Sequence, residues 1–151
     1  MKAEVWVEVR PTEDEEKVRR ALSNVFIYDE IRIEESEGKR YIVALGNGFK
    51  SLIKVHNLIK EQGIEDSARS VLMRGGIDGN RVVFHLHKQA AYAGVLTFVT
   101  EENESPLGPI TFIVETNDPP KRLIDWLAPK TARGRRLYEV QPPLMIREDK
   151  F

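Results

Sequence analysis

Lys88 and Gln89 lie at the break in a long, mostly apolar stretch, 82–98, and their polar side chains could do chemistry there. The small residues Ala90 and Ala91 follow, and they let another backbone come close. Lys88 supplies a point charge, and Gln89 supplies an amide that both donates and accepts hydrogen bonds. One interpretation is a contact to the phosphate and sugar groups of RNA. The other is a β-bulge or a short helical turn in which these side chains satisfy exposed backbone groups.

Basic residues elsewhere could extend such a surface. Two lysines lie on the open side of a predicted helix, and one arginine lies just before the predicted strand that contains the break. An arginine cluster lies on a glycine-containing segment near the C-terminus. Phosphate contacts of this kind would weaken as salt rises, although a solvated helix face explains the two lysines equally well. The candidate RNA-contacting residues are Lys88, Gln89, Arg81, Lys50, Lys54, Arg133, Arg135 and Arg136.

His85 and His87 lie two residues apart on a predicted strand, so both point to the same side, a spacing that can hold a metal. A third ligand is needed, and His56 lies on the apolar side of its predicted helix. Packing of the histidines against a neighbouring helix is the competing interpretation, and we predict no metal and no cofactor. Nucleophile-elbow, Walker and dinucleotide-binding motifs are absent. We therefore predict a protein that is not an enzyme. A metal-dependent enzyme that uses this histidine pair is a further hypothesis.

The composition fits one globular domain. The chain has 151 residues, a net charge of −1 and no cysteine, which excludes disulfides and thiolate chemistry. Basic residues are in excess over 50–88 and 119–151, and acidic residues over 1–49 and 89–118, so basic and acidic faces could form. No apolar run reaches the roughly 18 residues of a membrane helix. We expect a cytoplasmic protein with no membrane partner.

The elements that must position these residues follow from periodicity and from helix start and stop signals. Thr12 and Glu15 form a predicted capping box for the first helix, and Asp118 is the predicted cap of the last, with Pro119 as its first residue. We predict strands at 3–9, 28–35, 40–45, from 82 to the break, 95–99 and 110–116, and helices at about 12–24, 49–63, 64–74 and 119–128.

Strands joined mostly by hairpins, with helices grouped between them, predict an α+β fold with a largely antiparallel sheet and helices packed on one face. We predict a single α+β domain over 1–129. Residues 130–151 are predicted to form a C-terminal extension that is partly ordered at most.

Four segments together resemble the archaeal family of uncharacterised proteins called UPF0201: VEVRPTEDEEKVRRAL, LHKQAAYAG, ESPLGPI and IDWLAPKT. The resemblance covers nearly the whole chain. It implies a fold like ribosomal protein L5 and a role as an RNA-binding protein that accompanies an RNA-processing complex, the archaeal exosome. The family motif usually has Asn where this chain has His87. The residues carried over are Lys88, Gln89, Ala90, Ala91, Pro106, Leu107, Gly108, Asp125, Trp126, Leu127, Ala128 and Pro129.

Our first hypothesis is a non-catalytic RNA-binding protein of an archaeal cytoplasm that contacts structured RNA through its shape and backbone. The alternative is a structural or interaction protein that forms a homodimer or docks onto a larger complex. Exposed strand edges, Trp6, Trp126 and the PLGPI loop would then build the interface.

Overall fold

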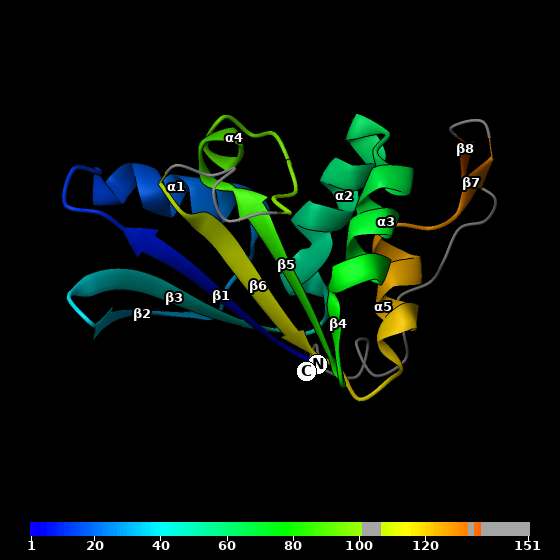
Figure 1. Ribbon diagram of the computed structural model, residues 1–151, viewed down its shortest axis with the longest axis horizontal. Coiled ribbons are helices and arrows are strands. Elements are labelled where there is room, and N and C mark those ends of the chain that lie inside the picture. The colour runs from blue at the N-terminus through cyan, green and yellow to red at the C-terminus, as the bar shows by residue number, and fades with distance from the viewer. Residues whose placement is uncertain (101–106, 133–134, 137–151) are drawn as a thin grey trace.

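The fold is built on a six-stranded sheet with strands in the order β2-β3-β1-β6-β5-β4, and every neighbouring pair is antiparallel (Figure 1). The computed structural model describes residues 1–100, 107–132 and 135–136. The strands are β1 Lys2–Val9, β2 Glu30–Ser36, β3 Lys39–Asn47, β4 Ile77–Asp78, β5 Arg81–His87 and β6 Pro109–Glu115. A separate pair joins β7 Thr131–Ala132 to β8 Arg135–Arg136. The predicted α+β class and antiparallel sheet are therefore confirmed.

Five α-helices occur in the described residues, and their buried side chains share one core with one face of the sheet. On α1 the buried residues are Val18, Ala21, Leu22 and Val25, the spacing that the sequence predicts for an apolar stripe. The helices are α1 Glu15–Val25, α2 Ile53–Gln62, α3 Glu65–Gly75, α4 Lys88–Tyr92 and α5 Pro120–Leu127, with a 3₁₀ helix η1 Phe49–Leu52 before α2.

Strand alternation divides the sheet into an inner and an outer face. On β1 the residues at odd positions from 3 to 9 are buried, whereas Glu4, Trp6 and Glu8 are half-buried on the outer face. Three phenylalanines anchor the inner face. Phe112 of β6 stacks on Phe84 of β5 at 4.7 Å between ring centroids and meets Phe26, just after α1, edge-on at 5.5 Å. Burial of these large rings makes this face the main hydrophobic core.

The break after β5 is a short helix. Of the two local structures predicted there, the helical turn forms, and α4 begins at Lys88. The predicted strand at 95–99 is wrong in extent, because only a single bridge, Leu86 to Phe98, joins it to the sheet. Gln62 of α2 donates to the carbonyl of Leu96 (2.9 Å) and accepts from its amide (2.8 Å). The Val95 amide, which would extend the ladder to β5, donates instead to the Ala90 carbonyl of α4 at 2.9 Å.

Two predicted helix caps are wrong by one or two positions. Asp14 is the N-cap of α1, because its carboxylate accepts from the Glu16 amide at 3.0 Å. The predicted capping box of Thr12 and Glu15 therefore does not form. The N-cap of α5 is Pro119, one residue after the predicted Asp118. Asp118 instead donates its amide to the Thr116 hydroxyl at 3.1 Å.

The likeness to ribosomal protein L5 and the domain boundary at residue 129 stay predictions. Within the predicted extension the structure describes the pairing of β7 with β8, while 133–134 and 137–151 lie outside the described residues. None of the helices in the described ranges has the length and apolar character needed to cross a membrane.

Candidate nucleic-acid interface

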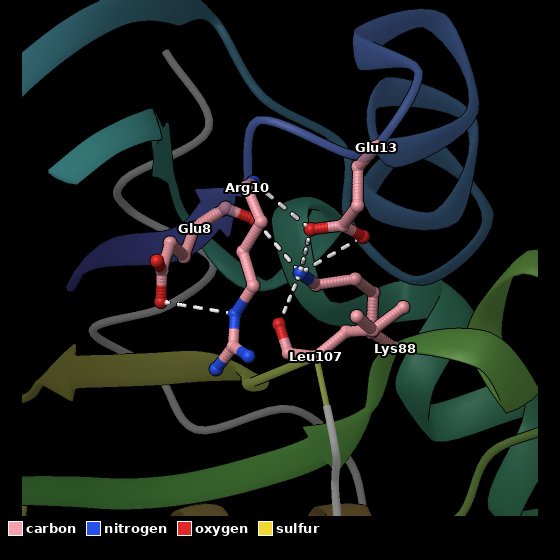
Figure 2. A network of polar contacts seen from close by, with 5 residues as sticks. All are labelled: Glu8, Arg10, Glu13, Lys88 and Leu107. Atoms are coloured by element: carbon pink, nitrogen blue, oxygen red, sulfur yellow. Dashed lines mark hydrogen bonds and ion pairs between the residues drawn. The ribbon is translucent and has the colours of Figure 1, made fainter.

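Lys88 lies at the centre of a buried polar network (Figure 2). Its side chain is 4% exposed, and its ammonium group is 3.0 Å from Glu13 Oε1. The same group donates to the carbonyl oxygens of Glu8 (2.7 Å) and Leu107 (2.6 Å). Three acceptors from three distant segments therefore use the three N–H groups that a lysine has. The network ties together the end of β1, the segment before α1, the start of α4 and the residue two before β6.

Two opposing effects act on the Lys88 ammonium group. Burial lowers its pKa, and the hydrogen bond and negative charge of Glu13 oppose that shift. Glu13 is itself only 10% exposed, and it also accepts from the Arg10 amide at 3.0 Å. Arg10 Nε lies 3.7 Å from Glu8 Oε1 (Figure 2). Glu13 thus compensates the buried charge of Lys88, and Glu8 lies beside the charge of Arg10, which is 40% exposed.

Lys88 was predicted as an RNA contact on the surface, but its ammonium group lies inside the protein. Gln89, the next residue, is exposed. The signature pair is therefore divided between two roles. Lys88 holds the start of α4 in place, and Gln89 presents its amide to solvent.

A cavity of about 310 Å³ lies between α1 and α4, beside the Lys88 network. We call it the α1–α4 cavity. Val18 and Ala21 of α1 give it apolar lining, Lys17 adds an exposed cation, and Glu13 and Asp14 add carboxylates before the helix. From α4 come Gln89 and Tyr92, whose residue exposure is 39%. An apolar lining with a few convergent polar groups is typical of small-ligand sites.

Two side chains fix α4 where it lines this cavity. Asn24 of α1 donates to the carbonyls of Ala91 (3.0 Å) and Tyr92 (3.2 Å), which satisfies acceptors at the helix end. At the other end, His87 Nδ1 accepts from the Ala90 amide at 3.1 Å. His87 is thus the N-cap of α4. A neutral imidazole can do here what an asparagine side chain does at other helix starts, since both offer an acceptor to the backbone.

Arg81, Lys50 and Lys54 lie on other elements than Gln89. Arg81 begins β5, so it lies roughly 20 Å from α4 along that strand. It is exposed and pairs with Asp78 at 2.7 Å. Lys50 is exposed, with its ammonium 4.0 Å from Asp29. Lys54 is half-buried and donates to the carbonyl of Ser23 at 2.6 Å, which ties α2 to the end of α1.

The arginine cluster near the C-terminus is described only in part. Arg135 and Arg136 form β8, whose backbone pairs with Ala132 and Thr131. Arg133 lies outside the described residues. The predicted phosphate contacts of all three arginines therefore stay predictions.

The histidines each have a protein partner. His85 Nδ1 lies 2.9 Å from the hydroxyl of Thr111 on β6, and His87 caps α4 as described above. His56 stacks on Trp126 with centroids 4.6 Å apart, and its Nδ1 lies 3.0 Å from the Trp126 carbonyl. Within the described ranges, no group of three or more His, Asp or Glu side chains has a metal-binding arrangement.

Comparison with known proteins defines the class of this fold and site. A family model described as RNA binding matches residues 2–116, which include β1 to β6 and the α1–α4 cavity. A UPF0201 protein of Pyrobaculum neutrophilum is 52% identical over 143 residues, covering 95% of this chain and 99% of that protein. Another, from Metallosphaera sedula, is 48% identical over 139 residues, covering 92% of this chain and 95% of that protein.

Solved structures agree. The crystal structure of a UPF0201 protein from Methanococcus jannaschii has a TM-score of 0.77 and 29% identity, covering 91% of this chain and all of that one. The chain belongs to the UPF0201 family.

Several residues of the site were not predicted from the sequence. Glu13, the partner of Lys88, was not among the candidate residues. Lys17 and Asn24 were not singled out, because each is an ordinary polar residue on a helix. Tyr92 had a usable signal: it lies four residues after Lys88, so a helical turn places both on one side.

Proposed function

We propose that this protein is a non-catalytic, cytoplasmic RNA-binding protein. It recognises structured RNA by the shape of the RNA and by contacts to the RNA backbone. The observation that carries the proposal is the match of residues 2–116 to a family model described as RNA binding. That region contains the whole six-stranded sheet and α1 to α4. Recognition by shape and by sugar and phosphate groups suits a protein without a strong net charge, because it does not need one large basic surface.

The proposed contacts are the predicted residues that the structure leaves on the surface. Gln89, Lys50 and Arg81 are exposed. Lys54 takes a supporting place, because its ammonium group already donates to a backbone carbonyl. The arginine arm, Arg133 to Arg136, is proposed as a further phosphate contact. Lys88 contributes indirectly, because it holds in place the helix α4 to which Gln89 belongs.

A titration of labelled duplex RNA at two salt concentrations tests the proposal. Binding at low salt that weakens at higher salt is expected, because cations on the protein release counterions from the phosphates. The variant Lys50→Gln should weaken binding and reduce the salt dependence. Lys39→Gln is the matched control, because Lys39 is an exposed lysine at the β2–β3 turn, away from the proposed contacts. Absence of binding at low salt, or affinity that ignores salt, refutes the proposal.

The non-catalytic part of the proposal has its own test. Labelled RNA incubated with the protein, with and without Mg²⁺, should be recovered at its original length. Cleavage that follows the protein through purification would show an enzymatic activity instead.

A second function, association with another protein or a second copy, is favoured by the edge of the sheet. Strand β2 is an edge strand whose outward backbone groups have no neighbouring strand in the described sheet. On the outer face near it, Trp6 meets Tyr41 of β3 edge-on at 5.5 Å between centroids. Trp126, which the sequence analysis assigns to such an interface, is 3% exposed and belongs to the core. Light scattering that gives the mass of a dimer would support this function, and a monomer mass would oppose it.

A further inference from the structure

We propose that the α1–α4 cavity binds one unpaired nucleobase, so that the RNA ligand is a structured RNA with a bulged or looped-out nucleotide. This inference rests on the proposed RNA binding and adds the class of ligand. Sequence-specific contacts to RNA are made mostly to unstacked bases, which stack on aromatic rings and present their edges for hydrogen bonds. The cavity offers a group for each of these contacts.

The size of the cavity suits a single base. Its volume of about 310 Å³ lies at the low end of the roughly 300–1,000 Å³ typical of ligand sites. The lining atoms of Val18 and Ala21 are apolar and lie on the buried stripe of α1. A flat, largely apolar base would replace water against this lining, whereas a base that stays paired within an RNA helix could not enter the cavity.

Tyr92 supplies the stacking surface. The residue is 39% exposed although it ends a helix that packs against α1. An exposed aromatic ring beside an apolar cavity presents its face to a ligand at low conformational cost. Every base has a π-face, so stacking on a tyrosine gives affinity for an unpaired base of any type.

Gln89 of α4 and Lys17 of α1 supply polar contacts within the same lining. The Gln89 amide is exposed and can both donate to and accept from a base edge. Lys17 lines the cavity from α1, and Arg20 lies three residues further along the same helix, also exposed. Residues at this spacing are neighbours on a helix surface. They therefore suit the phosphates that flank a base held in the cavity.

The α4 side of the cavity is fixed before any ligand arrives. Lys88 holds the first turn of α4 through Glu13 and two carbonyls, and Asn24 holds the carbonyls of Ala91 and Tyr92. A site whose groups are already in place loses less freedom on binding. This accounts for the buried Lys88 on the same short helix as the exposed Gln89 and Tyr92.

The test compares two RNAs in the same titration: a perfect hairpin duplex, and the same duplex with one bulged 2-aminopurine. The wild-type protein should bind the bulged RNA roughly 5- to 100-fold more tightly, the factor expected for one base stacked on an aromatic ring. The fluorescence of the 2-aminopurine should fall on binding, because the base stacks on Tyr92. Equal affinity for the two RNAs, with no fluorescence change, overturns the base pocket but leaves RNA binding intact. Failure to bind either RNA overturns the proposed function itself.

Variants locate the effect in the cavity. Tyr92→Leu removes the ring and should abolish the preference for the bulged RNA, while Tyr92→Phe should keep it. Gln89→Ala should reduce the preference, and Val95→Ala is the control, because Val95 is 45% exposed in the same segment but does not line the cavity. Thermal unfolding checks that each variant is folded. A preference that survives in folded Tyr92→Leu, or that Val95→Ala removes equally, contradicts the proposal.

Discussion

Lys88→Met removes the ammonium group from the buried network and leaves most of the side-chain volume. Glu13 then has a carboxylate that is 10% exposed and has lost its cation, and the Glu8 and Leu107 carbonyls lose a donor. Breaking a buried ion pair from one side typically costs about 3–5 kcal/mol, mainly because the remaining charge stays desolvated. We expect a loss of this size in the free energy of unfolding.

Denaturant unfolding and thermal unfolding of Lys88→Met, Glu13→Gln and the double variant measure this loss. For a chain of this length the single variant should lower Tm by about 6–20 °C, from roughly 2–4 °C for each kcal/mol. The double variant should lose clearly less than the sum of the two single losses, because neither charge is then left alone. Lys121→Met is the matched control, since Lys121 is 59% exposed and 4.0 Å from its partner, and it should change stability by less than about 1 kcal/mol. A Lys88→Met loss within that same limit, or additive losses in the double variant, would refute the buried-pair reasoning.

Three further predictions concern the same region and the core. Because burial lowers the pKa of Lys88 in the folded state, the unfolded chain binds more protons between that pKa and the ordinary value of 10.5. The free energy of unfolding should therefore rise with pH across that window relative to Lys88→Met, and unfolding curves of both proteins at several alkaline pH values check the difference. His87→Ala should lower stability by about 1 kcal/mol, because α4 loses its cap. His87→Asn should keep most of the stability that the cap gives, and thermal unfolding of both variants checks this. Gly46→Ala should lower the free energy of unfolding by about 1–3 kcal/mol in a denaturant titration. The new Cβ would lie 2.8 Å from Ser51 Cβ and 2.9 Å from the Ile27 carbonyl oxygen. Gly38→Ala is the comparison, because Gly38 has a left-handed backbone in open space, so its cost comes without a clash.

The elements that the sequence predicts well are those whose pattern depends on near neighbours. The alternation over 3–9 forms β1, and the stripe of Val18, Ala21, Leu22 and Val25 forms the buried side of α1. Both patterns follow from the geometry of a single strand or helix, so they need no knowledge of what packs against it.

The elements that the sequence predicts poorly depend on partners from elsewhere in the chain. Residues 95–99 have the composition of a strand, but Gln62 holds the backbone of Leu96 from another element. The cap of α1 is a different case, because Asp14 rather than Thr12 reaches a helix amide only two residues away. Two neighbouring residues could each cap the helix, and their types alone do not select between them.

The signature pair Lys88 and Gln89 shows the same division most clearly. The sequence by itself determined that two polar residues interrupt an apolar stretch and that an α+β fold surrounds them. Only the tertiary structure decided that the ammonium group of Lys88 lies inside against Glu13, a residue 75 positions away, while Gln89 lies on the surface. Periodicity is a local property of the chain, whereas desolvation and charge pairing depend on which distant segments meet, and that is settled only when the sheet and helices pack together.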